Sequence, residues 1–416
     1  MRAAVVAVGD ELLLGDIVNG NAAWLGAQLA AVGCPVVHSS MVGDSVERIV
    51  VALRRALEDA DVVVLTGGLG PTVDDLTRDA VALVAEAPLV RQPAIEVELR
   101  ERFAAYGYHD LPEAVMQQAD VPRGATVLDN PVGSAPGLRI ALGEQLVYAM
   151  PGPPHELAAV MQAVLPELAA RSGSVVLTRT LHCGGLGESA VAELVQAAIE
   201  VPAHVALAYL AGGAVVRVRL TTAAPTVEQA DAVLRPLVEA AAAALSDAVF
   251  GRDEDSLSAV VVRALQQAGA TVAVAESLTA GLVGGALTEV PGSSAVFRGG
   301  VQVYATDLKT TLAGVPDRVL AEHGAVSPQT AQALAEGVRD RLGATYGLAL
   351  TGVAGPDAQE GHPPGTLHVA VAGPYGVQVR SVRLPGDRQR VRLLAVNAGL
   401  DLLRRALTKD AAGPLR

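Results

Sequence analysis

The chain has 416 residues, of which 51% are hydrophobic and 18% charged, and this composition excludes an intrinsically disordered protein. Its 31 Lys and Arg against 44 Asp and Glu give a formal net charge of −13, which argues against a protein that binds nucleic acid by neutralising phosphates. The two cysteines, Cys34 and Cys183, are too few for a disulfide framework or a four-ligand zinc site. No stretch reaches about 18 uncharged apolar residues and the first residues do not resemble an export signal, so we expect a cytoplasmic protein without a membrane segment.

Short apolar runs alternate with helical patterns over the first part of the chain. Strands are predicted at 3–9, 35–42, 61–66, 137–142 and 145–150, and helices at 21–32, at 45–59 and from about residue 74 onward. Ser45 is the expected N-cap of the second helix. Because strands that alternate with helices pair in parallel, residues 1–170 are predicted to form a doubly wound α/β domain.

A small α+β module is predicted over residues 171–252. It contains a strand at 175–182, a helix at 186–200, a hairpin of 205–210 with 214–222 around Gly212-Gly213, and a helix at 227–245. The polar stretch 251–255 is interpreted as a linker or the entry to the next helix.

A second α/β domain is predicted over residues 253–416. Helices are expected at 256–268, 280–289, 329–342 and 388–407, and strands at 271–275, 296–304 and 347–350, with an antiparallel pair at 366–372 and 377–384. The predicted fold class is therefore α/β, with two α/β domains joined by the small α+β module.

The strongest functional signal in the first domain is the segment 66–77, where a strand ends in a glycine-rich turn before a helix. Three glycines would let a ligand approach the backbone, and free N–H groups at a helix start attract phosphate: Gly67, Gly68 and Gly70. Asp74 and Asp75 follow, and they would repel phosphate unless a divalent cation lay between them. Helix capping is the alternative explanation of these aspartates.

This segment resembles the molybdopterin-binding family of MoaB and MogA. Asn19, Asn21 and four further segments extend the resemblance to the N-terminal domain of the CinA family: 9–16, 42–44, 133–137 and 150–154. It implies a MoaB-like fold and metal-dependent hydrolysis of ADP-ribose to AMP and ribose 5-phosphate. The implied site consists of the three glycines with Thr72 for the substrate and four carboxylates for the metal: Glu11, Asp44, Asp74 and Asp75.

The metal expected at this site is Mg²⁺ or a similar oxygen-loving cation. Cleavage of a pyrophosphate needs a polarising cation, a positioned water and donors for the developing charge. No paired-histidine zinc motif is present. Asp44 precedes Ser45, so the alternative explanation for Asp44 is that it merely neighbours an N-cap.

The basic residues include only two lysines, Lys309 and Lys409. In a chain that favours arginine this strongly, a retained lysine is a candidate for a role that arginine cannot fill, because only lysine can lose its proton. Chance explains Lys409 near the tail, whereas Lys309 is predicted to be functional.

Ser277 follows the predicted strand 271–275, where its hydroxyl is expected beside free backbone N–H groups, as a nucleophile with an oxyanion site. An ordinary N-cap is the alternative explanation. Tyr304 and Lys309 lie farther along, and a lysine whose pKa is lowered by burial can accept the serine proton. Short-chain dehydrogenases also pair Tyr with Lys, but with a different spacing, and no G-x-G-x-x-G opens this domain.

The segment 351–356 ends another apolar strand in a possible phosphate loop, and Arg388 is a candidate phosphate clamp. Together these motifs resemble the PncC family, the nicotinamide mononucleotide (NMN) deamidases that form the C-terminal domain of CinA. The resemblance implies hydrolysis of NMN to nicotinic acid mononucleotide and ammonia, with no cofactor. It assigns Ser277 as nucleophile, Tyr304 and Lys309 as its activating pair, and four substrate contacts: Thr351, Gly352, Gly355 and Arg388.

The chain departs from this family pattern at two places. The family has Ser-Cys-Thr-Gly-Gly where residues 277–281 are Ser-Leu-Thr-Ala-Gly. The methyl group of Ala280 is expected to narrow the space in which the substrate and the backbone approach each other. After Pro356 the glycine-rich tail is replaced by Asp-Ala-Gln-Glu-Gly at 357–361, which is expected to alter the shape of the loop and its phosphate affinity.

The CinA resemblance continues through the middle module, which is KH-like in that family. Gly184-Gly185-Leu186-Gly187 offers the glycines of a KH loop, but Glu188 follows and the chain is acidic, so nucleic acid binding is not expected. A spacer or dimerisation role is expected instead, and we expect a homodimer.

The predicted protein is a bifunctional hydrolase of pyridine-nucleotide metabolism that acts on NMN and ADP-ribose. Two alternatives stay open. A molybdopterin-binding protein of cofactor assembly is favoured by the first domain alone, and the fused third domain argues against it. A non-catalytic competence or DNA-repair partner is favoured by the family name, and the net charge and the Ser–Tyr–Lys set argue against it.

Overall fold

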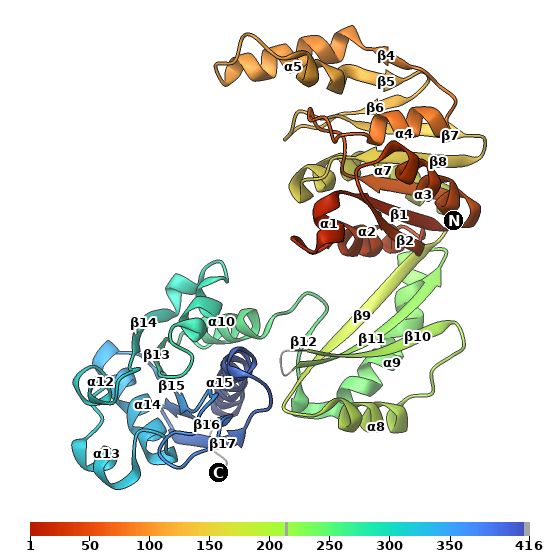
Figure 1. The fold of residues 1–416 in the computed structure, drawn as a ribbon. Helices are drawn as coiled ribbons and strands as arrows, with labels where there is room; N and C mark the ends of the chain where they lie inside the picture. Colours follow the sequence, from red (N-terminus) through yellow and green to blue (C-terminus); the bar gives the residue numbers. More distant parts are fainter. Residues whose placement is uncertain (213–214, 412–416) are drawn as a thin grey trace. The chain divides into compact units, whose positions relative to one another are not determined.

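The computed structural model describes residues 1–212 and 215–411. These residues form two compact units: 1–177 with 222–233, and 178–221 with the chain from 234 onward (Figure 1). Gly213 and Ala214 of the predicted hairpin lie outside the described residues, while Gly212 lies inside them. No helix among the described residues is long and apolar enough to cross a membrane.

The first unit is built on a six-stranded sheet. Its strands are β1 (Ala3–Val8), β2 (Val36–Val42), β3 (Val62–Thr66), β6 (Thr126–Leu128), β7 (Gly137–Leu142) and β8 (Gln145–Met150). The order is β2-β1-β3-β8-β7-β6, in which the first four strands are parallel and β7 runs antiparallel to both of its neighbours. The sheet is therefore mixed at one edge, because the two-residue turn between β7 and β8 makes a hairpin.

Helices cover both faces of this sheet. They are α1 (Asp10–Leu14), α2 (Gly20–Ala31), α3 (Val46–Asp59), α4 (Thr77–Val84), α5 (Pro93–Ala105), α6 (Glu113–Met116) and α7 (Pro154–Ser172), with the strand pair β4 (Leu89–Arg91) and β5 (Asp120–Pro122) beside them. Successive residues of β1 point to opposite faces. Ala4 and Val6 pack in a core with α3 and α4, whereas Ala3 and Val5 pack in another core with α2 and α7. Burial on both faces explains why β1 is apolar throughout.

The helix expected from residue 74 begins only at Thr77. Thr77 instead donates its hydroxyl to Gly67 O at 2.7 Å and its backbone N–H to Gly68 O at 3.0 Å. Residues 74–76 are thus part of the turn, so helix capping does not explain Asp74 and Asp75. The N-cap assigned to Ser45 is confirmed, because its hydroxyl accepts from Arg48 N.

The middle module contains a four-stranded sheet in the order β10-β11-β9-β12. Its strands are β9 (Val175–Gly184), β10 (Val205–Gly212), β11 (Val215–Ala224) and β12 (Val249–Arg252), and its helices are α8 (Glu188–Ala198) and α9 (Val227–Leu245). The interpretation of 251–255 as a linker is wrong for Gly251 and Arg252, which pair with β9 as part of an edge strand. A strand of only four residues carries too little alternation to be recognised from sequence.

The second α/β domain has the sheet order β14-β13-β15-β16-β17. Its strands are β13 (Val272–Glu276), β14 (Phe297–Gln302), β15 (Tyr346–Gly352), β16 (Thr366–Gly373) and β17 (Gly376–Arg383). The first three strands of that order are parallel, and β16 and β17 form the predicted antiparallel pair.

Helices again cover both faces of the sheet. They are α10 (Leu257–Gln267), α11 (Leu282–Thr288), α12 (Thr306–Thr311), α13 (Asp317–His323), α14 (Pro328–Leu342) and α15 (Arg388–Ala411). One core lies under α10, α11 and α15 and contains Val274 and Leu348, and the other lies under α14 and contains Ala273 and Ala349. The predicted α/β class, with two α/β domains and a middle module, is confirmed.

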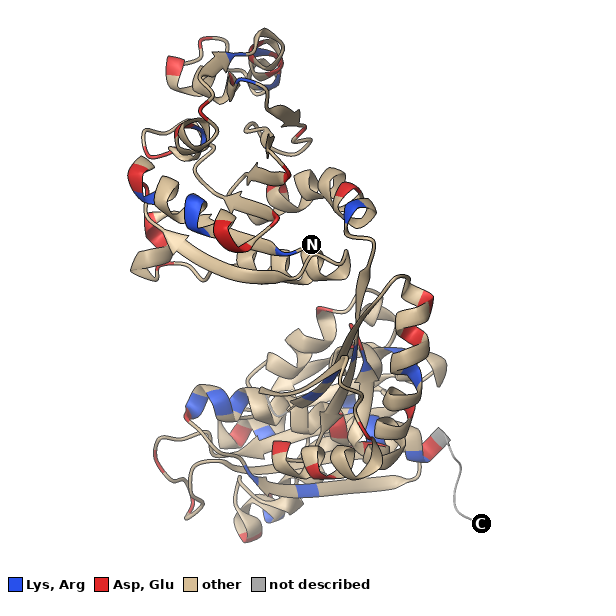
Figure 2. Cartoon of the chain, turned by 90° about the vertical axis from the view of Figure 1, so that its right-hand side faces the viewer, with Lys and Arg blue, Asp and Glu red and all other residues tan. Residues whose placement is uncertain are grey.

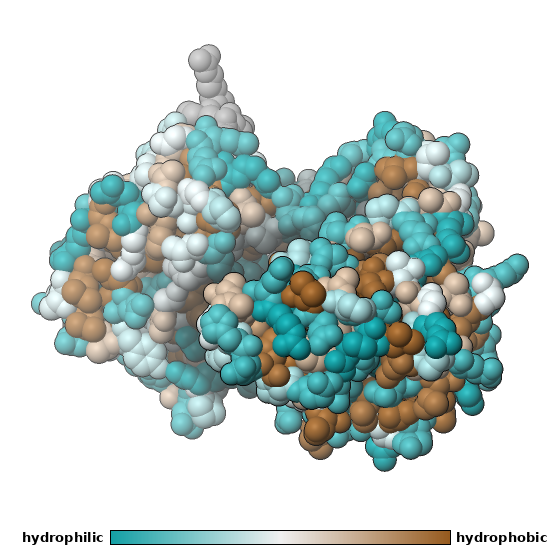
Figure 3. Space-filling view, turned by 90° about the horizontal axis from the view of Figure 1, so that it is seen from above, coloured by the Kyte–Doolittle hydropathy of each residue, from teal (hydrophilic) through white to brown (hydrophobic). Residues whose placement is uncertain are grey.

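Acidic and basic residues are mixed along both units (Figure 2). On the face shown in Figure 3, apolar residues lie in patches separated by hydrophilic residues.

Candidate active sites

The first unit has a cavity of about 590 Å³ at the carboxyl ends of β1, β3 and β8. Ligand sites of open α/β sheets lie at this edge, because the loops that follow parallel strands converge there. The eight predicted residues of the first domain all line it: Glu11, Asp44, Gly67, Gly68, Gly70, Thr72, Asp74 and Asp75. The structure therefore brings together segments that lie far apart in the sequence.

The glycines of the turn are required by packing within the chain itself. Gly67 and Gly68 have positive φ angles of 102° and 68°, a region that favours glycine. A Cβ atom on Gly67 would overlap Val8 O, and one on Gly68 would overlap the hydroxyl of Thr77. The backbone around the turn is thus closely packed against β1 and the start of α4.

Buried Arg78 holds this turn from inside the domain. Its guanidinium donates to Leu69 O and, at 3.0 Å, to Gly70 O. Burial lowers the pKa of Arg78, and the nearby Asp75 opposes that shift. Asn21 adds a second tie, because its amide donates to Thr66 Oγ1 at 3.0 Å and to Gly152 O at 2.7 Å.

The carboxylates of the cavity differ in their surroundings. Asp44 accepts a hydrogen bond from Asp10 N at 2.9 Å, and its pKa is raised by burial and by the negative charges of Asp10, Glu11 and Asp74. Asp75 accepts from the N–H and the hydroxyl of Thr72 at 2.7 and 2.6 Å. Both carboxylates thus accept hydrogen bonds, but Asp44 is in addition surrounded by like charges.

These carboxylates fit a divalent cation in chemistry, since carboxylate oxygens are the ligands that Mg²⁺ prefers. Among the residues that the structure describes, no three acidic, histidine or cysteine side chains meet at one point as a ready-made metal site. Mg²⁺ commonly takes one or two carboxylates and completes its shell with water and substrate phosphate. The assignment of Glu11, Asp44, Asp74 and Asp75 as metal ligands stays a prediction.

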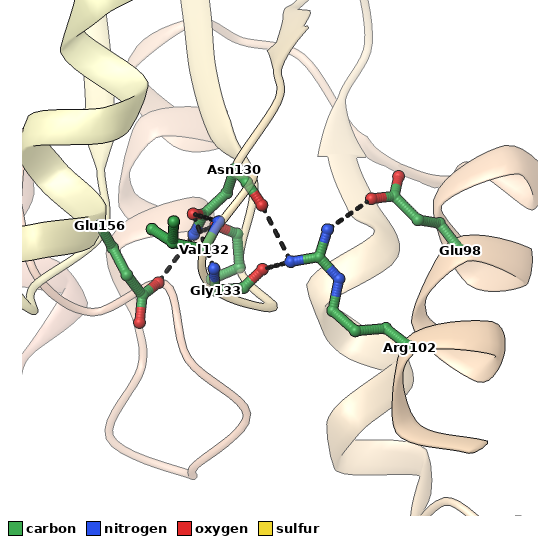
Figure 4. A network of polar contacts seen from close by, with 7 residues as sticks. Glu98, Arg102, Asn130, Val132, Gly133 and Glu156 are labelled. Atoms are coloured by element: carbon green, nitrogen blue, oxygen red, sulfur yellow. Dashed lines mark hydrogen bonds and ion pairs between the residues drawn. The ribbon is translucent and has the colours of Figure 1, made fainter. Parts of the chain in front are cut away.

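The loop 130–136 forms another wall of the cavity through Ser134 and Ala135. Figure 4 shows how it is fixed: the amide of Asn130 donates to Glu156 at 2.7 Å, and its oxygen accepts from Gly133 N at 2.9 Å. Arg102 from α5 donates to Asn130 O and Gly133 O. Sequence reasoning noted this loop only as a motif and missed the two side chains that position it.

In the second unit, Ser277 follows β13 directly, and the loop after it is held by two charged side chains. Glu276 is buried and its carboxylate accepts from the N–H groups of Gly281, Val283 and Gly284 at 2.9–3.0 Å. Arg392 of α15 donates to the carbonyl oxygens of Leu278 and Thr279 at 2.9 Å each. The N–H groups at the start of α11 are thus occupied by Glu276 and are not available to a substrate.

Ala280 lies in the same loop with a φ of 49°, in the left-handed region. This is the position where the PncC pattern has glycine. Alanine in that conformation carries a strain of roughly 1–2 kcal/mol because its Cβ approaches the following carbonyl oxygen. The departure noted in the sequence therefore has a conformational cost.

Lys309 lines a cavity of about 180 Å³ at the carboxyl ends of β13 and β15. Its ammonium nitrogen is 3.2 Å from Ser277 Oγ and 2.7 Å from Val303 O. Lys309 is only 1% exposed, and burial lowers its pKa to about 8 although the charge of Glu360 opposes the shift. At pH 7 about a tenth of the amine is then neutral and able to accept a proton.

Tyr304 lies at the mouth of this cavity, 60% exposed. Arg388 donates to Tyr304 Oη at 2.8 Å and to Gly355 O at 2.7 Å. Thr351 is buried and its hydroxyl donates to Ala325 O at 2.7 Å. All seven predicted residues of this domain line one cavity, but the direct contact is between Ser277 and Lys309, and Tyr304 contacts Arg388.

Three side chains beside the predicted set also line or support the cavity. Asp357 and Gln359, from the altered tail after Pro356, line it. Arg392 holds the Ser277 loop from a helix that lies more than 100 residues away along the chain. No local sequence pattern signals Arg392, because its partners are backbone carbonyls.

Two α/β domains, each with a cavity at the carboxyl ends of its parallel strands, define a multidomain α/β protein with two separate candidate sites. Three family models match the chain: the CinA C-terminal domain at 254–407, the probable molybdopterin binding domain at 4–170, and the damage-inducible protein CinA KH domain at 178–251. A CinA-like protein of Frankia casuarinae is 52% identical over 98% of this chain and 96% of its own length. The chain belongs to the CinA family, and the predicted resemblance is confirmed.

One further relative agrees with this assignment. A putative competence-damage inducible protein of Desulforamulus reducens is 39% identical over 98% of this chain and 99% of its own length. A solved structure, the protein CinA from Thermoplasma acidophilum, is 36% identical, covers 40% of this chain and 97% of its own, and has a TM-score of 0.38.

Proposed function

We propose that the C-terminal domain is an NMN deamidase that uses Ser277 as nucleophile and Lys309 as general base. The contact of 3.2 Å between Lys309 Nζ and Ser277 Oγ, two buried side chains, is the observation that carries this proposal. Neutral Lys309 takes the proton of Ser277 as Oγ attacks the carboxamide carbon. The same lysine then donates that proton to the departing nitrogen, ammonia leaves, and water releases the acid product from the serine by the reverse sequence.

Arg388 is the proposed contact for the phosphate of NMN. Its guanidinium lies at the mouth of the cavity and is oriented by Gly355 O and Tyr304. A planar guanidinium binds phosphate oxygens through two parallel hydrogen bonds, so it fixes orientation as well as charge. Tyr304 is therefore proposed to position Arg388 rather than to activate Ser277.

The N-terminal domain is proposed to hydrolyse ADP-ribose to AMP and ribose 5-phosphate with a divalent cation. The observation that supports this is the cavity that four carboxylates line together with the glycines of the turn. A bound cation would supply polarisation of a phosphoryl oxygen. Glu11, Asp44 and Asp74 would hold it, while Asp75 fixes Thr72 and with it the shape of the turn.

The deciding experiment incubates the purified chain with NMN and, separately, with ADP-ribose plus Mg²⁺, and identifies the products by chromatography. We expect nicotinic acid mononucleotide and ammonia from the first mixture, and AMP with ribose 5-phosphate from the second. A chelator should stop only the second reaction. Absence of either product set overturns that half of the proposal, and equal sensitivity to the chelator overturns the division between the two sites.

A further inference from the structure

A second cavity of about 530 Å³ lies in the second unit, outside both candidate active sites. Its walls come from the glycine loop before α8, the end of β10 and the start of β11, β12, the start of α10, β17 with the residues after it, and α15. Apolar side chains line most of it, including Phe250, Leu257, Val382 and Leu394. Cavities that bind organic ligands have this size and are mainly apolar with a few polar groups.

Three arginines also line this cavity, namely Arg380, Arg383 and Arg390. No carboxylate among the described residues forms an ion pair with any of them. The other charged lining residues are Glu188 and Asp401, and Asp401 is neutralised by Arg404 and Arg405 at 2.8 Å each. The lining therefore carries an excess of positive charge in a chain whose net charge is −13.

The arginines of this cavity do not belong to the Ser277 site. Helix α15 turns by about 100° per residue, so Arg390 projects from the side of the helix roughly opposite to that of Arg388 and Arg392. Those two residues hold Gly355, Tyr304 and the Ser277 loop. One helix thus contributes cations to two separate cavities.

We propose that this cavity binds a small organic anion that has an apolar or aromatic body. The unpaired guanidinium groups of Arg380, Arg383 and Arg390 recognise the phosphate, sulfonate or carboxylate group, because charge-assisted hydrogen bonds from arginine are strong and directional. The side chains of Phe250 and Leu394 contact the body and remove it from water. This is a third ligand site, independent of the two proposed reactions.

The test measures binding of 8-anilinonaphthalene-1-sulfonate, an aromatic sulfonate, to the full chain by its fluorescence. Three variants are compared with the parent: Arg380→Gln with Arg390→Gln, Ala398→Phe to fill the cavity, and Arg123→Gln with Arg318→Gln. The last is the matched control, because it removes two charges from exposed arginines that do not line the cavity. Circular dichroism establishes that each variant is folded.

We expect saturable binding by the parent and the control, and binding at least tenfold weaker in both cavity variants. Weaker binding by the Ala398→Phe variant would be due to the filled cavity, because this substitution removes no charge. No saturable binding by the parent, or equal binding by all four proteins, overturns the proposal. Binding of a labelled single-stranded oligonucleotide without binding of the sulfonate overturns it in favour of nucleic acid. The measurement uses neither NMN nor ADP-ribose, so its result does not depend on whether the two proposed activities are correct.

Discussion

The side chain of Lys309 reaches Ser277 from helix α12, and its ammonium nitrogen lies 3.2 Å from Ser277 Oγ and 2.7 Å from the carbonyl oxygen of Val303. The hydrogen bond to Val303 O holds the ammonium group in place but does not pair its positive charge, since a carbonyl oxygen is not an anion. Burial then disfavours the charged amine, and the serine lies within reach of the neutral form.

Replacing Lys309 with arginine is expected to lower kcat for NMN deamidation by roughly 10²–10⁴-fold, because arginine stays protonated and cannot act as a base. Lys409→Arg is the matched control, since Lys409 is the other lysine of the chain and is exposed. Steady-state ammonia release by the folded variants measures the effect. A kcat within a few-fold of the parent would remove the general-base role from Lys309.

The pH profile of deamidation is expected to follow the ionisation of Lys309. Its pKa is lowered to about 8, so the neutral base predominates above that pH and is lost as the pH falls through that value. The kcat/KM for NMN should therefore fall about tenfold per pH unit below pH 8 and level off above it. Initial rates from pH 6 to 9.5 measure this, and a flat profile below pH 8 contradicts the assignment.

Replacing Tyr304 with phenylalanine tests whether this residue activates the serine or positions Arg388. Its hydroxyl bonds to Arg388 and the side chain is 60% exposed, so we expect KM for NMN to rise several-fold with little change in kcat. If kcat falls a hundredfold at unchanged KM, Tyr304 takes part in the chemical step as the family resemblance implies.

The Asp75→Asn variant is expected to lose ADP-ribose cleavage by at least tenfold while NMN deamidation stays unchanged. Without its charge, residue 75 accepts weaker hydrogen bonds from the N–H and the hydroxyl of Thr72, and the cavity has one negative charge fewer. Asp79→Asn, on the exposed face of α4, is the control. Product formation from both substrates is measured side by side, and full ADP-ribose cleavage by Asp75→Asn would exclude Asp75 from the site.

Replacing Ala280 with glycine is expected to stabilise the C-terminal domain by about 1 kcal/mol. Its φ of 49° is strained for alanine and allowed for glycine, although glycine loses more backbone entropy on folding. Ala286→Gly, inside α11, should instead destabilise by a similar amount. Chemical denaturation of the three proteins gives the ranking, and destabilisation by Ala280→Gly would contradict the strained conformation.

The sequence predicted most elements of the two α/β domains, because buried parallel strands leave continuous apolar runs such as β1 and β3. It also identified Ser277 through its motif and Lys309 through the scarcity of lysine, and the structure brings the two together. The contact between Tyr304 and Arg388 was not predicted, since the motif specifies residue types and not their partners.

Other features were missed because the sequence gives them no local signal. Glu276 accepts hydrogen bonds from three N–H groups of the following loop. A glutamate at the end of a strand does not by itself indicate such contacts in the sequence. The late start of α4 was missed because aspartates in a first turn normally favour a helix, whereas here Asp75 binds Thr72 within the turn.

The burial of Lys309 determines which lysine of the chain can be labelled by chemical modification. Lys409 is the other lysine of this sequence and is exposed, whereas Lys309 is shielded at 1% exposure. Reagents that acylate lysine side chains will therefore attach at Lys409 and leave the Ser277 cavity intact. A dye or a biotin anchor can thus be introduced without mutation, while slow acylation of Lys309 would report transient opening of the domain around it.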